Sequence, residues 1–431
     1  MVNRRSVPCF VLILGVLMSL QAPGAGEQAV LTSPGSPEVV SLQSLVREAL
    51  ERNPEIQAAR LAADAKRARI RQAGAWPDPK LSVSYGGNVF PPFTIMPGDP
   101  SSNRQIMAEQ EVPYPGKTRL RSRVAAKEAD AESFVADSVA RRVTSEIKQT
   151  YFELHFTDQS LSTLRQSREL LERFEKVAEI RYSVGKAAQQ DVLRAQVELS
   201  KINERATMLE QSRRALTAQL NSLRDRAADA PIGSPAELRP STLPSSIDDL
   251  LSAAQSSFPD LKRQRTMVDG NRLAFDLAKR DVRPDFSVGY AYMQRHGLPD
   301  MYGITLSTSL PVFRRSKQDM AITEAAANLE SSRRMEANEL RVLRYRVEQE
   351  YFEVQAAEKL LKLYSQAVVP QSRLALDSSV ASYETGATDF LTVLTNLSTV
   401  LDYQLNYQQQ LVNHEKALAR LEELTGLNLT Q

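Results

Sequence analysis

The sequence predicts a mainly α-helical fold with a small β part. Two duplicated helix–strand–strand–helix–helix units form long α-helical coiled-coil hairpins, and they give four strands to a β-barrel shared between copies of the chain. Three observations predict this fold class. A turn motif occurs twice, about 200 residues apart. Residues 117–181 contain neither proline nor glycine, and pairs of alternating apolar and polar segments occupy equal places in the two halves.

The repeated turn motif marks the tips of two helical hairpins. Its copies occupy residues 182–193 and 383–394. Each copy has a glycine, Gly185 or Gly386, where a helix is expected to stop, because glycine takes a left-handed backbone conformation without steric cost. An aspartate then favours the start of the next helix. The predicted tips are at about residues 182–190 and 383–391.

The first 26 residues have the pattern of an export signal. Arg4 and Arg5 precede an apolar run, which ends in small residues. Cys9, the only cysteine, stands before that run, where a lipoprotein cysteine does not occur. Removal of this signal leaves no thiol and equal numbers of basic and acidic residues, so nothing indicates thiol chemistry or nucleic-acid binding. We predict a signal peptide over residues 1–26 and an extended N-terminal segment over residues 27–40.

The first structural repeat is predicted over residues 41–225. It opens with helical spacing that is broken at Asn53-Pro54. Two alternating segments follow, at about residues 80–86 and 104–112, with a loop rich in glycine and proline between them. A helix from Lys117 then runs to the first tip. At 1.5 Å per residue it is about 100 Å long, which calls for a coiled-coil setting.

The second half of the chain repeats this order. Pro284 and Pro311 stand before and after its strand pair, as Pro79 and Pro113 do in the first half. A duplication of this extent indicates one structural unit used twice. The predicted parts are a linker over residues 226–246, a second repeat over 247–425 with strands at about 285–293 and 302–310, and a C-terminal tail over 426–431.

The alternating segments place apolar side chains on one face and small polar ones on the other. Val83 and Val288 lie on the apolar face, and Ser82 and Ser287 on the polar face. Half-buried strands of a soluble protein are one explanation, but no apolar helix face is available for four such strands. Apolar-out, polar-in strands in an exported chain suit an outer-membrane barrel. A barrel must close in lipid and needs about eight strands or more, so four strands per chain require a symmetric oligomer.

With these features the chain resembles the TolC-like outer-membrane factor family, the exit ducts of tripartite efflux and type I secretion systems. The likeness covers Ser41 to Leu429 and rests on the duplicated units, the prolines around the strands and the paired tips. It implies a homotrimer with a shared barrel in the lipid of the outer membrane and a tunnel of helices, about 100 Å long, in the periplasm. An equatorial belt is implied for the N-terminal segment, the linker and the tail.

The resemblance also implies partners. A periplasmic adaptor docks at the tips and links the passive duct to an inner-membrane pump. The motifs most similar to the heavy-metal branch of the family, whose pumps are of the resistance-nodulation-division type, are Trp76-Pro77-Asp78-Pro79 and Tyr114-Pro115-Gly116-Lys117 with Arg119 and Arg121. The implied adaptor-docking residues are Val184, Gly185, Lys186, Thr385, Gly386 and Ala387.

The periplasmic gate departs from the family pattern. In the family, two acidic residues follow the second tip glycine by six and nine positions and form charged rings. The matching residues here are Thr392 and Thr395. The nearest carboxylate on that helix is Asp389, for which helix capping is an equal explanation. These three residues are the candidate gate.

The sequence shows no pattern for catalysis or for a cofactor. Gly116-Lys117-Thr118 resembles part of a phosphate loop, but Glu111 stands where the first glycine belongs. The three histidines are not at metal-ligand spacing, and four methionines near strand ends are expected to be barrel-rim residues rather than soft-metal ligands. We therefore expect no enzyme, cofactor or metal site. The residues concerned are His155, His296, His414, Met96, Met107, Met293 and Met301.

Three functions stay open. The first is an exit duct for heavy-metal cations, the second a drug-efflux or type I secretion duct of the same fold, and the third a periplasmic coiled-coil scaffold without a pore. The export signal and the strand pairs favour a duct. Recovery of the mature protein from outer membranes as a heat-modifiable oligomer separates the ducts from the scaffold.

Overall fold

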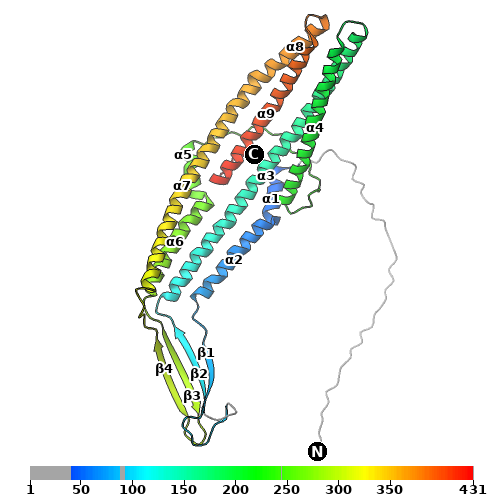
Figure 1. Cartoon of the computed structure of the whole chain (residues 1–431). Coiled ribbons are helices and arrows are strands. Elements are labelled where there is room, and N and C mark those ends of the chain that lie inside the picture. The colour runs from blue at the N-terminus through cyan, green and yellow to red at the C-terminus, as the bar shows by residue number, and fades with distance from the viewer. Residues whose placement is uncertain (1–39, 88–92, 244, 431) are drawn as a thin grey trace, which may run out of the picture. The chain divides into compact units, whose positions relative to one another are not determined.

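The computed structural model describes residues 40–87, 93–243 and 245–430. The predicted signal peptide, all but the last residue of the predicted extended segment, and Gln431 lie outside the described residues. The described chain is mostly helical and has one four-stranded antiparallel sheet, so the predicted fold class is confirmed (Figure 1).

The helices and strands follow the order expected for a duplication. The first half contains α1 (Leu42–Arg52), α2 (Pro54–Gly74), β1 (Lys80–Gly86), β2 (Asn103–Val112), α3 (Lys117–Ser183) and α4 (Gln189–Leu223). The second half contains α5 (Ile247–Ser257), α6 (Pro259–Arg280), β3 (Phe286–Gln294), β4 (Met301–Thr308), α7 (Gln318–Leu363), the π-helical turn η1 (Tyr364–Val368), α8 (Val369–Thr385) and α9 (Phe390–Thr425).

The break between α1 and α2 is built by Asn53-Pro54. The Asn53 Oδ1 accepts hydrogen bonds from the backbone N–H groups of Glu55 (2.9 Å) and Ile56 (3.1 Å). Pro54 is the first residue of α2, where a missing N–H costs nothing. The Asn53 amide also donates to the Leu223 carbonyl at 2.9 Å. This one side chain therefore starts α2 and ties it to the end of α4.

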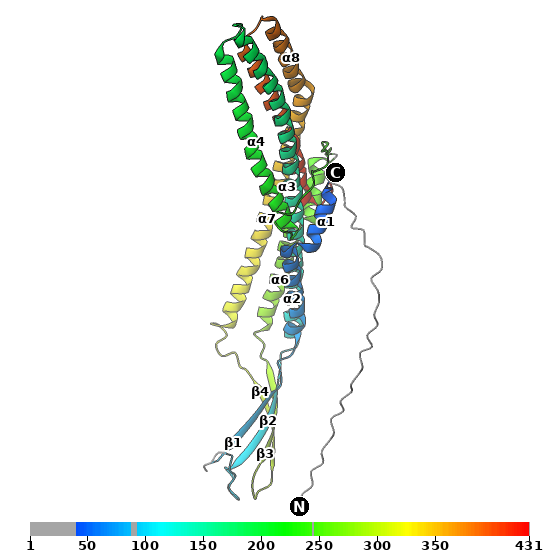
Figure 2. The ribbon, with the colours of Figure 1, turned by 90° about the vertical axis from the view of Figure 1, so that its right-hand side faces the viewer.

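The long helix α3, of 67 residues, runs through both halves of the helical region. Near the strands the neighbouring helices are α2, α3, α6 and α7 in that order (Figures 1 and 2). Toward the tips the order is α4, α3, α9 and α8. At 1.5 Å per residue α3 is about 100 Å long. The core follows this layout, because the three clusters of buried apolar side chains lie along α3, α7 and α9.

Three separate segments pack on the middle of α3 and α9. Val40, the described end of the N-terminal segment, bridges to Pro235 of the linker. The Tyr151 hydroxyl on α3 donates to the Val40 carbonyl (3.0 Å) and accepts from the Ala236 N–H (2.9 Å). In the tail, the Glu422 carboxylate accepts the N–H groups of Leu429 and Thr430, both at 2.6 Å. These contacts cover the middle of the helices with irregular chain.

The turn η1 is a feature that the sequence analysis missed. Pro370 stands at the second position of α8, inside what is otherwise one helix from α7 through α8. A proline there removes a helical hydrogen bond and its ring crowds the preceding turn. The π-helical turn Tyr364–Val368 precedes it and widens the helix. Among the described helices, α7 and α8 of the second repeat are thus separated by a π-helical turn, whereas α3 of the first repeat is continuous.

The strand boundaries of the second repeat differ from the predicted ranges by one or two residues. β4 ends at Thr308 instead of residue 310, and β3 begins at Phe286 instead of residue 285. Thr308 pairs with Phe286, and two residues further Pro284 has no N–H to donate to a partner. The Asp285 carboxylate is used instead at the helix–strand junction. The hydrogen-bonded pairing of β3 with β4 therefore ends at Phe286 and Thr308, close to Pro284, which has no backbone N–H to donate.

A buried histidine predicts a pH dependence of stability. Burial under the linker lowers the pKa of His155, although Ala236, Asp158 and Glu237 oppose this shift. His155 therefore binds fewer protons in the folded protein than in the unfolded chain, so its contribution to stability is complete above a pH of about 6.5 and is lost as the pH falls below that. We expect the midpoint of thermal unfolding of the purified protein to fall between pH 7.5 and 5.5, and the variant His155→Gln to lose part of this dependence.

The matched control is His296→Gln, in the exposed loop between β3 and β4. It should keep the pH dependence of the unmodified protein. If both variants lose it equally, or neither does, His155 is not the group responsible.

Candidate functional site

The register of the sheet separates two faces along all four strands. Val83 lies opposite Ile106, which lies opposite Tyr292, and Tyr290 lies opposite Ile304. The apolar face is exposed in the chain; Ile304, for example, is 81% exposed. Its apolar members are Leu81, Val83, Tyr85, Ile106, Ala108, Val288, Tyr290, Tyr292, Tyr302, Ile304 and Leu306, and the polar residues Arg104 and Gln110 lie on the same face toward the two ends of β2. The other face carries Ser82, Ser84, Gln105, Glu109, Glu111, Ser287, Thr305 and Ser307.

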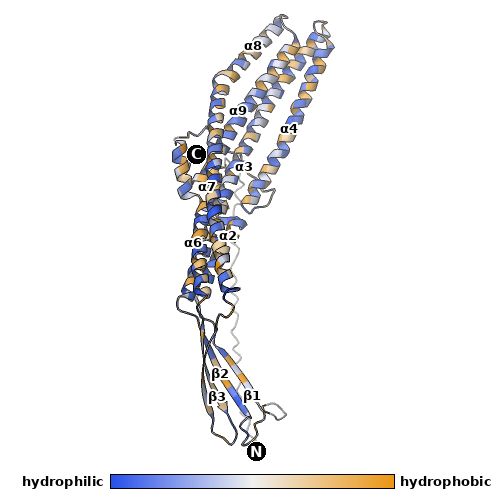
Figure 3. Ribbon diagram, turned by 60° about the vertical axis from the view of Figure 1, so that its left-hand side comes forward, coloured by the Kyte–Doolittle hydropathy of each residue, from blue (hydrophilic) through white to orange (hydrophobic). Residues whose placement is uncertain are grey.

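An exposed apolar face with a polar reverse side is costly in water and suits lipid on one side and a water-filled lumen on the other. Figure 3 shows the hydrophobic and hydrophilic residues alternating along the strands. The strands have 7, 10, 9 and 8 residues. A tilted transmembrane strand needs about 9–11 residues, so these strands are close to the span of a bilayer.

The two outer strands of the sheet are β1 and β4. Within the described part of the chain, neither has a strand on its outer side. Unpaired backbone groups cannot remain in the hydrocarbon of a membrane. The four strands alternate in direction, so β1 and β4 are the two open, antiparallel-compatible edges of the sheet within the described chain.

The strands and helices are joined by a buried lysine. Lys117, the first residue of α3, is 3% exposed, and its ammonium lies 3.0 Å from the Asp285 carboxylate and 2.7 Å from the Arg283 carbonyl. The Tyr114 N–H also donates to Asp285 at 2.6 Å. Burial would raise the pKa of Asp285, but these two partners outweigh it and lower the pKa. The contact joins the first repeat to the second just beyond the sheet.

The two tips have the same backbone geometry. Gly185 and Gly386 are left-handed, with φ of +73° and +78°. In the first tip the Gly185 N–H donates to the Tyr182 carbonyl and the Lys186 N–H to the Arg181 carbonyl, at 2.9 and 2.7 Å. The second tip has the equivalent bonds at 3.0 and 2.8 Å. Both are Schellman turns, which need glycine at the left-handed position. All six predicted docking residues are exposed.

One arginine connects the tips. The Arg181 guanidinium, in the last turn of α3, donates to the Tyr383 carbonyl at 2.6 Å and lies 4.5 Å from the centre of the Tyr383 ring. That ring contacts Phe390 at the start of α9. The first hairpin therefore holds the last turn of α8 in the second hairpin. Sequence reasoning missed this contact, because Arg181 reads as an ordinary basic residue at a helix end.

The three candidate gate residues lie together at the start of α9. The Asp389 carboxylate caps this helix and accepts hydrogen bonds from the backbone N–H (3.0 Å) and the hydroxyl (2.5 Å) of Thr392. These hydrogen bonds, the hydroxyl first, lower the pKa of Asp389. The Thr395 hydroxyl donates to the Leu391 carbonyl at 2.9 Å. The capping role of Asp389 is thus directly visible. The residue at the same place in the first tip, three after the glycine, is Ala188, which precedes α4 without a side-chain cap, and Asp191 lies three residues further on in the first turn.

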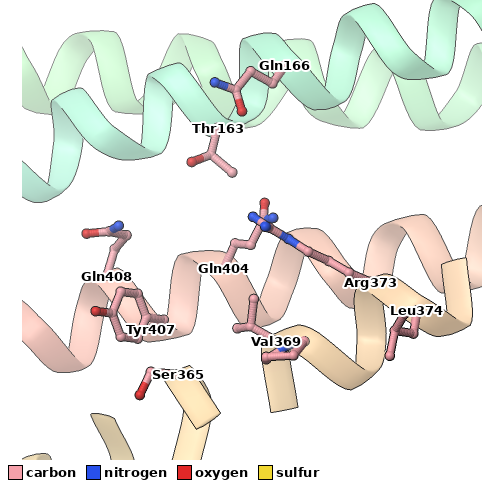
Figure 4. Close-up of a pocket in the computed structure, with 10 residues that line it drawn as sticks. Thr163, Gln166, Ser365, Val369, Arg373, Leu374, Gln404, Tyr407 and Gln408 are labelled. Atoms are coloured by element: carbon pink, nitrogen blue, oxygen red, sulfur yellow. The ribbon is translucent and has the colours of Figure 1, made fainter. Parts of the chain in front are cut away.

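Two cavities lie along the hairpins. One of about 560 Å³ lies between α4 and α9 near the tips and includes Thr395, Arg194 and Asp402 in its lining. The other, of about 630 Å³, lies beside η1 between α3, α8 and α9 (Figure 4). Gln404 of α9 and Arg373 of α8 extend toward each other, and Thr163 and Gln166 of α3 lie opposite them. Both are open grooves between helices and contain mixed polar and apolar side chains.

The described residues contain no cluster of three or more histidine, cysteine or acidic side chains placed to hold a metal ion. His155 and His414 are buried on α3 and α9. The prediction that all four methionines lie near strand ends is wrong for Met107. This residue is the fifth of the ten residues of β2, because the strand extends from Asn103 to Val112. Among the described helices, none has the length and apolarity needed to cross a membrane.

Comparison with known proteins agrees with this geometry. The solved outer-membrane protein VceC of Vibrio cholerae matches with a TM-score of 0.77 at 18% identity, over 90% of this chain and 96% of that one. CusC, described as forming a transmembrane channel, matches with a TM-score of 0.77 at 15% identity, over 90% and 92%. The cobalt-zinc-cadmium resistance protein CzcC of Cupriavidus metallidurans is 22% identical over 407 residues, 90% of each chain.

A family model described as "Outer membrane efflux protein" matches residues 45–224 and 250–427, which are the two structural repeats. The proteins of this family are channels and not enzymes. The chain therefore belongs to the outer membrane efflux protein family, whose members are outer-membrane channels with a helical tunnel in the periplasm.

Proposed function

We propose that the protein is the outer-membrane exit duct of a tripartite efflux system and that it conducts heavy-metal cations passively. An inner-membrane pump, of the resistance-nodulation-division type, supplies the energy, and a periplasmic adaptor joins pump and duct. The observation that carries the proposal is the combination of an open-edged sheet with an apolar outer face and two equal, exposed tips at the other end of the helices.

A homotrimer is the assembly we propose. Four strands per chain then give a closed barrel above the minimum of about eight. The helix layer has open flanks at α2 and α7 near the strands and at α4 and α8 near the tips. Rotation about one axis brings each flank against the opposite flank of the next copy, as in a closed ring with cyclic symmetry.

The tips are the proposed adaptor site. Their six exposed residues lie on turns that share one backbone shape, so one kind of adaptor surface fits both. The candidate gate lies directly beside the second tip. With threonines at the positions of the acidic rings and Asp389 engaged in capping, we propose that this gate is closed by packing and hydrogen bonds rather than by repulsion between carboxylates.

Metal cations are the proposed substrate because CzcC is named for cobalt, zinc and cadmium resistance and because Glu109 and Glu111 lie on the polar face of β2. The test is a deletion strain, with its tolerance of cobalt, zinc, cadmium, copper, silver and two common antibiotics compared with the parent. We expect lower tolerance of one or more of the metals, restored by the plasmid-borne gene, and unchanged tolerance of the antibiotics.

Other outcomes contradict the metal assignment. Lower tolerance of the antibiotics alone identifies a drug-efflux duct. Unchanged tolerance of all compounds, with oligomers present in the outer membrane, identifies a secretion duct. If no oligomer is found in the outer membrane, the scaffold without a pore is correct.

A further inference from the structure

The connection between β4 and α7 exposes an unusual group of side chains. We name residues 310–317 the junction segment. Leu310, Val312 and Phe313 are 74%, 78% and 76% exposed. Large apolar side chains in a row at this exposure are costly in water unless something covers them.

The junction segment continues the apolar face of the sheet. Ile304 and Leu306, on the outward face of β4, are also among the most exposed apolar residues, and Leu310 follows only two residues after the strand ends at Thr308. The same chain thus leads from the lipid-facing strand directly to Val312 and Phe313. At this level a membrane protein passes from hydrocarbon to headgroups.

Three cations follow the apolar residues at once. Arg314 pairs with Asp319 at 3.2 Å. Arg315 and Lys317 are exposed, and neither forms an ion pair within the described parts of the chain. Two unpaired cations beside an apolar run are the combination that binds an anionic lipid surface.

The duplication supplies an internal comparison. Arg315 stands four residues after Pro311, and its counterpart Lys117 stands four residues after Pro113. Lys117 is buried and paired with Asp285. One repeat therefore uses this cation to join the two halves, and the other repeat leaves it in solvent. A structural role explains the first cation and does not explain the second.

We propose that the junction segment binds the headgroups of anionic phospholipids in the periplasmic leaflet of the outer membrane. Leu310, Val312 and Phe313 enter the boundary of the acyl chains, and Arg315 and Lys317 contact the lipid phosphates. A second copy of the chain fits less well. The flank that meets this edge in a ring carries Asp78 and Lys80 at the same junction, which offers no net negative charge.

The test uses the purified full-length oligomer in a neutral detergent, with phosphatidylglycerol as the anionic probe and phosphatidylcholine of the same chain length as the neutral one. The variant Arg315→Gln/Lys317→Gln removes the free cations. The matched control Arg333→Gln/Arg334→Gln removes two exposed arginines from α7, the helix that follows the junction segment, where both are paired with Glu330.

We expect the unmodified protein and the control to prefer phosphatidylglycerol, and this preference to weaken with added salt. At about 1 kcal/mol for each cation near a lipid surface, the double variant should bind phosphatidylglycerol about thirtyfold more weakly, with phosphatidylcholine binding unchanged. Equal phosphatidylglycerol binding by the double variant and the unmodified protein overturns the inference.

Oligomer recovery is measured in the same samples. If the double variant falls apart into single chains, the segment is a contact between copies, which also overturns the inference. The inference rests on the barrel lying in the outer membrane. If the unmodified protein itself forms no membrane oligomer, the proposed function fails; if it forms normal oligomers without lipid preference, only this inference fails.

Discussion

Arginine in place of Val83 or Val288 should leave little or no oligomer in the outer membrane. Both valines are exposed on the apolar face of the sheet; Val83 is the central residue of β1, and Val288 is the third residue of β3. An arginine facing lipid at mid-bilayer costs about 2–4 kcal/mol. A symmetric oligomer repeats this cost in every copy, so the total is comparable with the whole stability of an ordinary domain, about 5–15 kcal/mol. The measurement is the amount of heat-modifiable oligomer in isolated outer membranes.

The neighbouring residues Ser82 and Ser287 supply the control. They lie one position away on the opposite face, so an arginine there points toward the lumen. The variants Ser82→Arg and Ser287→Arg should assemble at levels near those of the unmodified protein. Equal yields from the valine and serine variants would show that the faces are assigned wrongly or that these strands form no barrel.

Valine in place of Gly185 or Gly386 should abolish efflux while leaving normal oligomers in the outer membrane. Both glycines are left-handed, and a Cβ at either position meets no atom closer than 3.8 Å. The cost is therefore backbone strain of about 1–3 kcal/mol, confined to the end of a hairpin far along the chain from the strands. Relief of this strain reshapes the turn on which the adaptor is proposed to dock. Metal tolerance and crosslinking from Lys186 or Ala387 to the adaptor should fall together.

Gly98 provides the matched control for backbone strain. It has φ of +77° and nothing within 4 Å of its Cβ position, but it lies in the loop between β1 and β2. Gly98→Val should keep efflux. If Gly185→Val combined with Gly386→Val still exports at the unmodified rate, the tips are not the coupling surface.

The parts of the fold that repeat were predictable from sequence. Period-two alternation marked the strands, and glycine followed by aspartate marked both tips, because these signals depend on local chemistry. The unpredicted features depend on contacts between distant residues. Arg181 reaches Tyr383 across about 200 residues of chain, and Lys117 is buried only because Asp285 meets it. The turn η1 is caused by Pro370. A proline can break, kink or widen a helix, and the sequence position alone does not determine which of these occurs.

The candidate site divides in the same way. The six tip residues were placed on exposed turns by the glycine signal alone. The capping of α9 by Asp389 was one of two explanations, and the hydrogen bonds to Thr392 establish it without testing a gate. Asp191 follows its tip glycine by six residues, whereas Asp389 follows its own by three, so Asp191 lies within the first turn of α4 and Ala188 occupies the capping position. A local sequence pattern thus predicts the position of a turn better than it predicts which side chain caps the helix that follows.

Closure of the sheet by further copies is the central claim, and disulfide crosslinking between its outer strands tests it most directly. Cysteine at Ser82 on β1 is combined with cysteine at Gly303, Thr305 or Ser307 on β4, in a chain with Cys9 replaced by serine. Within one chain, β1 and β4 are three strand spacings apart, about 14 Å, which is beyond the reach of a disulfide. Oxidation of outer membranes should therefore join different copies, with at least one pair yielding a species of three chains and nothing larger. Recovery of single chains only, from all three pairs, would contradict the account.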